Sequence, residues 1–253
     1  MSQEPVELDV SAYMTKNPIT VSQNISFFDA VTKMYKNGIG NLIVINNEVI
    51  GLLSERQIIQ YLVTEKIIHD KPMSHVATSM FTKISPDISL LDAAKIRFEK
   101  NRKLLVFDNK KLVGILTTSD MLRGLRKLST APRLDKVLAP TLYTCSYDDS
   151  LFEQIKLMNE KRVGSVIVTR EGKPYGIFTE RDLICNLLAI AADMSETVGQ
   201  YSSHPLITAE VGINFHDAAS IMADNKIKRL PLTSQGKITT IVCACDLLRA
   251  FET

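Results

Sequence analysis

The stretch VIGLLSERQ, residues 49–57, decides the fold because near-copies of it recur three times along the chain. The copies read LVGILTTSD at 112–120, PYGIFTERD at 174–182 and ITTIVCACD at 238–246. The glycine, or the threonine that replaces it in the last copy, stands at 51, 114, 176 and 240, so the spacings are 63, 62 and 64 residues. Self-similarity at a fixed period indicates an internal repeat. The 253 residues are therefore predicted to form four similar units.

Each unit has the pattern strand, helix, strand, strand, helix. The first helix carries apolar residues at positions i, i+4 and i+7, which form one apolar stripe. In repeats 1, 3 and 4 these are Phe27, Val31 and Met34; Leu151, Ile155 and Met158; and Phe215, Ala219 and Met222. The two following strands are joined by polar pairs typical of hairpin turns. These pairs are Asn46-Asn47, Asp108-Asn109, Glu171-Gly172 and Gln235-Gly236.

The repeats are predicted to work in pairs, because a unit of about 60 residues buries too little surface to be stable alone. The longest polar connector without repeat character is RKLSTAPRLDK, residues 126–136. We therefore predict two pairs, residues 1–128 and 133–253, with repeats at about 13–63, 79–125, 137–188 and 201–252. The fold class is α+β, an α/β sandwich with a pseudo-two-fold axis in each pair.

Composition favours a soluble, cytoplasmic protein. Hydrophobic residues make up 45% and charged residues 23%, and 30 Lys and Arg balance 28 Asp and Glu. With this balance the chain has no strong positive electrostatic field that would attract nucleic acid or an anionic membrane. The beginning MSQEPVELDV has no pattern of a signal peptide. The longest apolar stretch, residues 183–194, is broken by Asn186 and is too short to span a bilayer.

The repeated chemistry is Gly, two apolar residues, Ser or Thr, two variable residues and Asp, and it allows two interpretations. Ser or Thr followed three residues later by an acid or amide is a capping box that starts a helix. A helix start with a hydroxyl also suits a phosphate, and a carboxylate can accept hydrogen bonds from ribose. Glycine within a strand marks a close approach by a ligand or by another backbone. The residues alone leave both readings open.

The four units resemble CBS repeats, which are named after the regulatory region of cystathionine β-synthase. The resemblance rests on the β-α-β-β-α order, the strand RLPLT at 229–233 and four motifs in register, and it covers nearly the whole chain. Two such repeats form a Bateman module, and four in one chain are similar in layout to the γ subunit of AMP-activated protein kinase. The resemblance implies regulatory binding of AMP, ADP, ATP or S-adenosylmethionine in clefts between paired repeats. The motif Asp would hold ribose, and the partner repeat would supply the adenine slot and phosphate contacts.

When the family's binding residues are transferred to the equivalent positions of this chain, the resemblance implies four clefts, which differ in how many of these residues are present. The most complete one combines two repeats through Thr179, Arg181, Asp182, Ile227, Lys228 and Arg229. A second one would use Asp246 with Thr144, Val163, Gly164 and Ser165. A third one, poor in cations, would use Thr117, Ser119 and Asp120 with Thr20, Ile39 and Gly40. The fourth is expected to stay empty, because Gln57 replaces the Asp and a neutral amide cannot match a charged double acceptor.

Other functions are disfavoured. Cys243 and Cys245 have no second Cys or His pair at zinc-finger spacing, so no metal site is expected. No Walker A loop, G-x-S-x-G or kinase motif occurs, and four repeats leave no room for a catalytic domain. We therefore predict a non-catalytic adenine-nucleotide sensor that signals to an unidentified protein partner, as a monomeric disc or a homodimer. A structural module without ligand and a nucleic-acid adapter are the alternatives.

Overall fold

A computed structural model describes residues 8–65, 70–130, 132–135, 137–138, 141–192 and 195–252 of the chain. Residues 131 and 136 of the predicted boundary segment 126–136, the N-terminal residues 1–7, and the last two residues of the apolar stretch 183–194 lie outside the described residues.

The chain folds into two compact units, and each contains two repeats that are not consecutive. The unit that we call the 1–3 unit comprises Ile19–Ser79 and Leu142–Leu206, which hold repeats 1 and 3. The 2–4 unit comprises Met1–Pro18, Met80–Thr141 and Ile207–Thr253, which hold repeats 2 and 4. This grouping differs from the predicted halves 1–128 and 133–253. The predicted pairing of consecutive repeats in ligand clefts involves residues of both units and stays a prediction.

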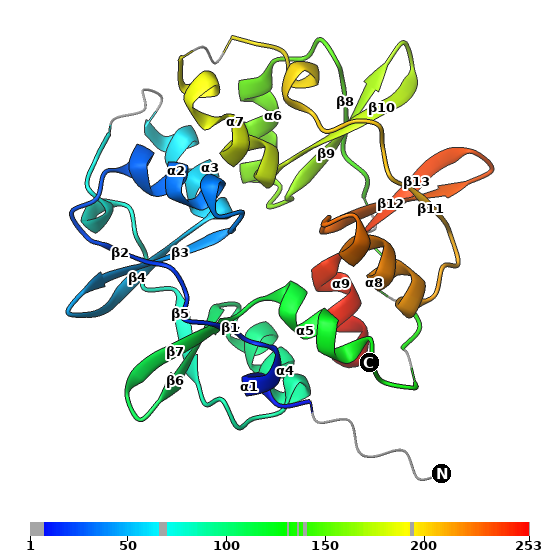
Figure 1. Cartoon of the computed structure of the whole chain (residues 1–253). Helices are drawn as coiled ribbons and strands as arrows, with labels where there is room; N and C mark the ends of the chain where they lie inside the picture. The colour runs from blue at the N-terminus through cyan, green and yellow to red at the C-terminus, as the bar shows by residue number, and fades with distance from the viewer. Residues whose placement is uncertain are drawn as a thin grey trace. The chain divides into compact units, whose positions relative to one another are not determined.

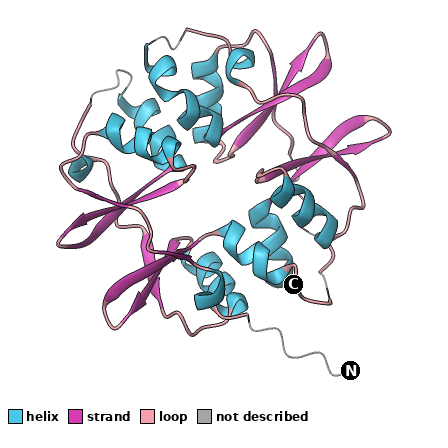
Figure 2. Ribbon diagram, in the orientation of Figure 1, coloured by secondary structure: helices cyan, strands magenta, loops and turns pink. Residues whose placement is uncertain are grey.

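In the 1–3 unit, helices of both repeats lie between two outer sheets (Figures 1 and 2). Repeat 1 consists of β2 (Thr20–Ser22), α2 (Phe27–Lys36), β3 (Asn41–Asn46), β4 (Glu48–Ser54) and α3 (Glu55–Glu65), followed by a 3-10 turn at Met73–His75. Repeat 3 consists of β8 (Thr144–Ser146), α6 (Leu151–Glu160), β9 (Ser165–Arg170), β10 (Lys173–Thr179) and α7 (Glu180–Ala192), followed by a 3-10 turn at Val198–Tyr201. In each sheet the middle strand pairs in parallel with the first strand and antiparallel with the third.

The 2–4 unit repeats this plan with an addition from the N-terminal segment. Repeat 2 consists of β5 (Phe81–Ile84), α4 (Leu90–Lys100), β6 (Lys103–Asp108), β7 (Lys111–Leu116) and α5 (Thr118–Leu125). Repeat 4 consists of β11 (Ala209–Glu210), α8 (Phe215–Asp224), β12 (Arg229–Ser234), β13 (Lys237–Cys243) and α9 (Ala244–Arg249), with a 3-10 turn at Ala250–Glu252. The N-terminal α1 (Val10–Tyr13) leads into β1 (Thr15–Lys16), which pairs with β7 and extends that sheet to four strands.

Each unit has one hydrophobic core, and both of its repeats contribute to it. The predicted apolar stripes are confirmed as core residues. The nine predicted side chains are at most 3% exposed: Phe27, Val31, Met34, Leu151, Ile155, Met158, Phe215, Ala219 and Met222. Burial of such stripes against another repeat removes apolar surface that a single repeat would expose.

The predicted hairpin turns are confirmed. Asn47, Asn109, Glu171 and Gln235 all adopt the left-handed conformation, with φ between 46° and 62°. In repeats 3 and 4 the next residue is a glycine, which enters this region without strain. The first helices also begin as local sequence dictates, because Ser26, Ser89, Ser150 and Asn214 accept the N3 amide of their helices.

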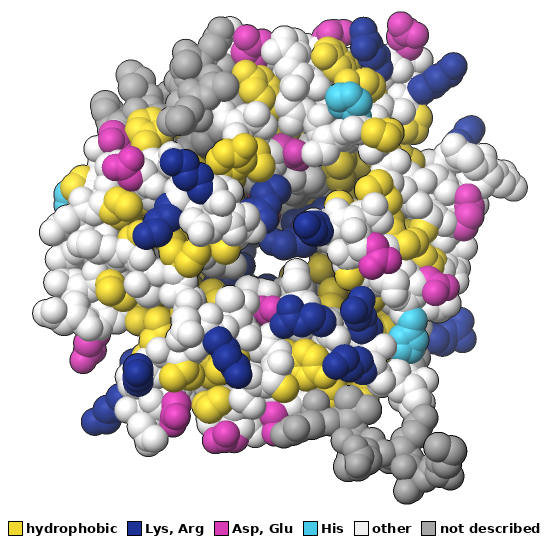
Figure 3. All heavy atoms as spheres, viewed as in Figure 1, with side chains coloured by type: hydrophobic (Ala, Val, Ile, Leu, Met, Phe, Trp, Pro, Cys, Tyr) yellow, Lys and Arg dark blue, Asp and Glu magenta, His cyan; other side chains and the backbone are white. Residues whose placement is uncertain are grey.

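Among the described residues, no helix has both the length and the apolar character to cross a bilayer. Charged side chains of both signs lie among small groups of hydrophobic ones on the face shown in Figure 3.

The motif glycine of repeats 1 and 3 is required by another backbone segment. A Cβ on Gly176 would lie 2.5 Å from the carbonyl oxygen of Ser203, and one on Gly51 would lie 3.0 Å from that of Thr78. Ser203 and Thr78 form isolated bridges to the residues that follow these glycines. In these two repeats, therefore, close approach of backbone explains the glycine.

We expect Gly176→Ala to lower the free energy of unfolding by about 1–3 kcal/mol, because the added methyl group displaces a backbone segment. Gly51→Ala is the matched variant and should have the smaller effect, since its methyl group has more room. Urea unfolding of the full chain measures both changes. Equal stability of Gly176→Ala and the unsubstituted protein would contradict the explanation.

Candidate functional site

All four motifs are built as helix caps. In repeat 3 the amide of Thr179 donates to Asp182 Oδ2 at 2.8 Å, and the amide of Asp182 donates to Thr179 Oγ1 at 3.3 Å. The same reciprocal pair joins Thr117 to Asp120, with 2.9 and 3.3 Å. Both bonds satisfy donors that a helix start leaves open. The capping interpretation of the motif is therefore confirmed for these repeats.

Repeats 4 and 1 form the cap with other atoms. In repeat 4 the amide of Cys243 donates to Asp246 Oδ2 at 2.8 Å, and Cys243 Sγ replaces the hydroxyl as acceptor of the Asp246 amide. In repeat 1 the amide of Ser54 donates to Gln57 Oε1 at 2.7 Å, and Ser54 Oγ accepts the Gln57 amide at 3.4 Å. The predicted capping by Gln57 is confirmed, so the substitution for Asp leaves the helix start intact.

The second carboxylate oxygen distinguishes the three acidic motifs, because it is not used in the cap. Asp182 Oδ1 accepts a hydrogen bond of 2.5 Å from Ser203 Oγ. Asp120 Oδ1 forms an ion pair of 3.2 Å with Arg123 Nη2, and its side chain is 6% exposed. Asp246 Oδ1 lies 4.0 Å from Arg249 Nη1, the longest of these contacts, and its side chain is 17% exposed. Asp246 therefore has the most exposed side chain of the three, and Asp182 has a second oxygen that already accepts a hydroxyl.

Burial raises the pKa of Asp182, and the hydrogen bonds from Ser203, from Thr179 and from its own amide oppose this rise. Desolvation penalises the charged carboxylate, whereas each donor stabilises it. The raised pKa means that the negative charge of Asp182 is incompletely compensated in the folded chain. A ligand that donates hydrogen bonds to Oδ1 would stabilise the charged form further.

The hydroxyl groups that contact the motif side chains were not found from the sequence. Ser203 Oγ donates to Asp182, and in repeat 1 Thr78 Oγ1 accepts a hydrogen bond from Gln57 Nε2. Both residues lie in the segments after the 3-10 turns, far from the motif in sequence. Their position is nevertheless regular, since each follows its motif glycine, Gly51 or Gly176, by 27 residues.

The structure places the other predicted residues on the strands beside the motif of their own repeat. Ser165 pairs with Thr179 across β9 and β10, and the carbonyl of Gly164 accepts the amide of Glu180 at 3.2 Å. Arg229 likewise pairs with Cys243 across β12 and β13.

The remaining predicted residues occupy equivalent turns and strands. The amides of Ile39, Val163 and Ile227 donate to carbonyls near the ends of α2, α6 and α8. The carbonyls of Gly40 and Lys228 accept the amides of Glu55 and Ala244, which begin the closing helices. Thr20 and Thr144 lie on the first strands and pair with the middle strands.

Every predicted cleft draws its two halves from different compact units. Thr179, Arg181 and Asp182 belong to the 1–3 unit, whereas Ile227, Lys228 and Arg229 belong to the 2–4 unit. The same division separates Asp246 from Thr144 and residues 163–165. It also separates Thr117, Ser119 and Asp120 from Thr20, Ile39 and Gly40. Their association in clefts therefore stays a prediction.

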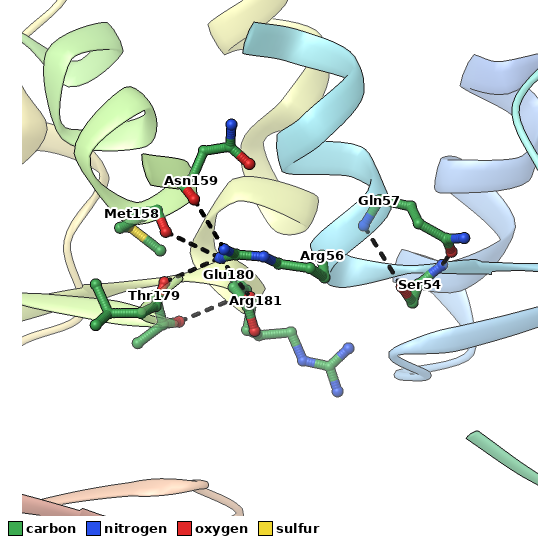
Figure 4. A network of polar contacts seen from close by, with 9 residues as sticks. Ser54, Arg56, Gln57, Met158, Asn159, Thr179, Glu180 and Arg181 are labelled. Atoms are coloured by element: carbon green, nitrogen blue, oxygen red, sulfur yellow. Dashed lines mark hydrogen bonds and ion pairs between the residues drawn. The ribbon is translucent and has the colours of Figure 1, made fainter. Parts of the chain in front are cut away.

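Arg181 and Arg56 occupy equivalent positions in their motifs and connect the two repeats of the 1–3 unit. Arg56 extends from α3 to the end of α6 (Figure 4), where it donates to the carbonyls of Met158 at 2.9 Å, Asn159 at 3.0 Å and Val163 at 3.2 Å. A guanidinium at a helix C-terminus satisfies open carbonyls and complements the helix dipole.

Arg181 makes the reciprocal contact. Its Nη2 donates to the carbonyl of Gly38, just after α2, at 2.7 Å, and its Nη1 lies 3.8 Å from Glu55 Oε1. Arg56 has the corresponding ion pair with Glu180, at 3.7 Å. The sequence places Arg181 among the predicted nucleotide-binding residues, which stays a prediction, and in the structure its guanidinium contacts the other repeat of its unit.

A short basic cluster, RGLRK, occupies residues 123–127, and two of its side chains contact the protein itself. Arg123 pairs with Asp120 and donates to the carbonyl of Tyr13, and the Lys127 ammonium lies 5.1 Å from the centre of the Tyr13 ring. Within the described parts of the chain, no group of three His, Cys, Asp or Glu side chains is arranged to hold a metal ion.

Comparison with known proteins identifies the repeats. The family model described as CBS domain matches residues 10–64, 73–127, 135–189 and 198–253. Protein MJ1404 of Methanocaldococcus jannaschii is 26% identical over 98% of this chain, which spans 62% of its length. The CBS domain-containing protein YhcV of Bacillus subtilis is 30% identical over 104 residues, covering 41% of this chain and 74% of that protein.

A solved structure has the same fold over almost the whole chain. It is protein MJ1225 of Methanocaldococcus jannaschii, proposed to be an archaeal homologue of the γ subunit of AMP-activated protein kinase. The TM-score is 0.82 at 20% identity, and the match covers 96% of this chain and 99% of MJ1225. The predicted α+β fold with four such repeats is thereby confirmed.

We expect Arg56→Ala to lower the free energy of unfolding by about 1.5–3 kcal/mol, because it removes charge-assisted hydrogen bonds to three carbonyls. Arg133→Ala is the control, since Arg133 pairs with Asp135 on the surface, where its side chain is 84% exposed and the pair adds little. Chemical unfolding of both variants provides the comparison. Equal losses in the two variants would contradict a special role of Arg56.

Proposed function

The chain belongs to the CBS-domain family, and from this premise we propose that it is a non-catalytic regulatory protein that binds adenine nucleotides. AMP, ADP and ATP are the proposed ligands, and an unidentified partner protein is proposed to respond to their binding. We place this activity in the cytoplasm. The layout of four repeats in one chain, shared with MJ1225, supports a regulatory rather than a catalytic role.

The observation that carries this proposal is that the two oxygens of a motif carboxylate have different contacts. Oδ2 of Asp182 is committed to the cap, while Oδ1 accepts a hydroxyl from Ser203 at 2.5 Å. A ribose offers two hydroxyl donors of the same kind, and an ionised carboxylate is a strong acceptor for them. Asp246 likewise uses Oδ2 in its cap, while its Oδ1 lies 4.0 Å from Arg249 Nη1 and its side chain is 17% exposed. Both are therefore proposed ribose acceptors, with Asp120 as a weaker third.

We expect Asp182→Asn to weaken AMP binding about ten- to hundredfold, corresponding to loss of about 1.5–3 kcal/mol for a charged acceptor. Asparagine is chosen because Gln57 shows that an amide can serve this cap. Asp217→Asn is the matched control, because Asp217 stands at the same position of α8 and is exposed. Isothermal titration of the full chain measures both affinities, and an unchanged affinity in Asp182→Asn would remove this residue from the site.

Lys228 and Arg229 are proposed to contact phosphate, because they are the basic pair at the start of β12. Arg229→Ala should therefore weaken AMP and ATP strongly and adenosine little, since adenosine has no phosphate. Titration of the three ligands against this variant and against Arg133→Ala gives the test. Equal losses for all three ligands would contradict phosphate recognition.

A structural module without ligand is the second candidate function, and the complete caps favour it. All four motifs, including the one with Gln57, satisfy their helix starts without any ligand. If titration of AMP, ADP, ATP and S-adenosylmethionine shows no binding to the intact chain, this second function replaces the first. Salt-dependent affinity for DNA or RNA would instead support the nucleic-acid adapter.

A further inference from the structure

Two residues of the 2–4 unit break the repeat pattern, and they contact each other. Seven residues after the start of the first helix, repeats 1, 3 and 4 have the buried Met34, Met158 and Met222, whereas repeat 2 has Arg97. Two residues into the closing helix, where repeats 1 and 3 have arginine, repeat 4 has Cys245. A charge at a position that is otherwise core requires a partner.

Arg97 finds this partner in the sulfur of Cys245. Its Nη2 lies 3.7 Å from Cys245 Sγ, and Thr118 Oγ1 from α5 lies 3.8 Å from the same sulfur. The Nη1 of Arg97 donates to the carbonyl of Arg102, while its buried Nε has no hydrogen-bond partner within the described part of the chain. The guanidinium is thus held against the thiol by the repeat 2 side of the unit.

Cys243 provides a second sulfur beside the first. It ends β13 and caps α9, and its Sγ accepts the amide of Asp246 at 3.3 Å. Cys245 follows it after a single residue, at the second position of the same helix. Both cysteines are free thiols and are partly exposed.

We propose that Cys243 and Cys245 form a hydroperoxide-reactive thiol pair, in which Cys245 is the attacking thiolate and Cys243 resolves the product to a disulfide. The proposal rests on the contacts of Arg97 and Thr118 with one sulfur and on the adjacency of the other. It does not depend on nucleotide binding.

The charges around the pair agree with these two roles. The hydrogen bond from Cys243 and the charge and hydrogen bond of Arg97 lower the pKa of Cys245, against the effect of burial. The pKa of Cys243 is raised by its bond to Cys245, by burial and by Asp246, while Arg229 on β12 opposes this rise. A thiolate beside a guanidinium is the reactive form of cysteine.

The chemistry balances in two steps. The Cys245 thiolate attacks one oxygen of a hydroperoxide, the O–O bond breaks, and the sulfur becomes a sulfenic acid while the other oxygen leaves as alkoxide or hydroxide and takes up a proton. The Cys243 thiol then attacks the sulfenic acid, an S–S bond forms and water leaves. The pair loses two electrons and the peroxide gains them. The disulfide removes the thiolate charge from Arg97 and so alters a contact between repeats 2 and 4.

The first experiment compares the alkylation rates of the cysteines in the intact chain. Cys185 is the internal control. Reagents can reach it because the residue is exposed, but partial burial of its sulfur raises the pKa of its thiol. With limiting iodoacetamide at pH 6, peptide mass mapping should show Cys245 modified about tenfold faster than Cys185. Reaction of Cys185 first, or at an equal rate, would overturn the assignment of Cys245 as the thiolate.

Arg97→Met tests the cause of this reactivity with the residue that the other repeats use. It should shift the pH at which Cys245 reacts upward, while Lys95→Met on the exposed side of the same helix should leave it unchanged. Thr118→Val is the second variant if Arg97→Met fails to fold, and it should shift the profile in the same direction by less. Unchanged profiles in both would overturn the role of these contacts.

The second experiment treats the full chain with stoichiometric hydrogen peroxide. We expect loss of two hydrogen atoms from the intact mass, a disulfide peptide that joins Cys243 to Cys245, and restoration by a dithiol. Cys243→Ser should stop at a sulfenic acid that dimedone traps on Cys245, whereas Cys145→Ser should behave like the unsubstituted chain. Disulfides only between chains, or oxidation that is unaffected by Cys245→Ser, would overturn the proposal.

Discussion

The structure depends on the need of each repeat to share its hydrophobic core with another. One face of each sheet and the apolar stripe of the first helix leave too much apolar surface for about 60 residues to bury alone. In both compact units the cores merge, so that Phe27 and Leu151 lie in one cluster and Leu90 and Phe215 in the other. The four repeated motifs lie at the starts of the closing helices, and this packing fixes the positions of those helices.

The motif of each repeat caps the start of its closing helix, with or without a ligand. One oxygen of the acid closes the cap, so the second oxygen is what remains for a ligand, and its neighbours differ among the repeats. Ser203, Arg123 and Arg249 contact this oxygen in turn. Retention of the motif in four copies therefore follows from helix initiation, whereas differences in ligand binding must come from residues outside it. Gln57 illustrates the point, because it preserves the cap while it lacks a charge.

The sequence predicted what periodicity and local chemistry determine. The apolar stripes, the four hairpin turns and the caps follow from residues close to one another, and each is found where expected. The grouping of repeats into compact units could not be predicted in this way, because four repeats with similar stripes offer several equivalent partners. The contact of Ser203 with Asp182 was missed for a related reason: it depends on a connecting segment that returns to the sheet 21 residues later. The contact of Arg181 with the carbonyl of Gly38 was missed in the same way, because Gly38 lies 143 residues earlier in the chain.

The two units join their repeats through different side chains at the closing helices. In the 1–3 unit the second residue of each closing helix is an arginine that binds a carbonyl near a helix end of the other repeat. In the 2–4 unit the charge comes instead from Arg97 on α4, and the closing helix presents Cys245. A phosphate that attracted Arg181 would have to compete with Gly38 and Glu55 for the same guanidinium. Because a ligand shifts an equilibrium only by its difference in affinity for two arrangements, that competition would couple ligand binding to the contact between repeats 1 and 3. Arg181 would therefore lose part of its contact with repeat 1 if its guanidinium bound a phosphate.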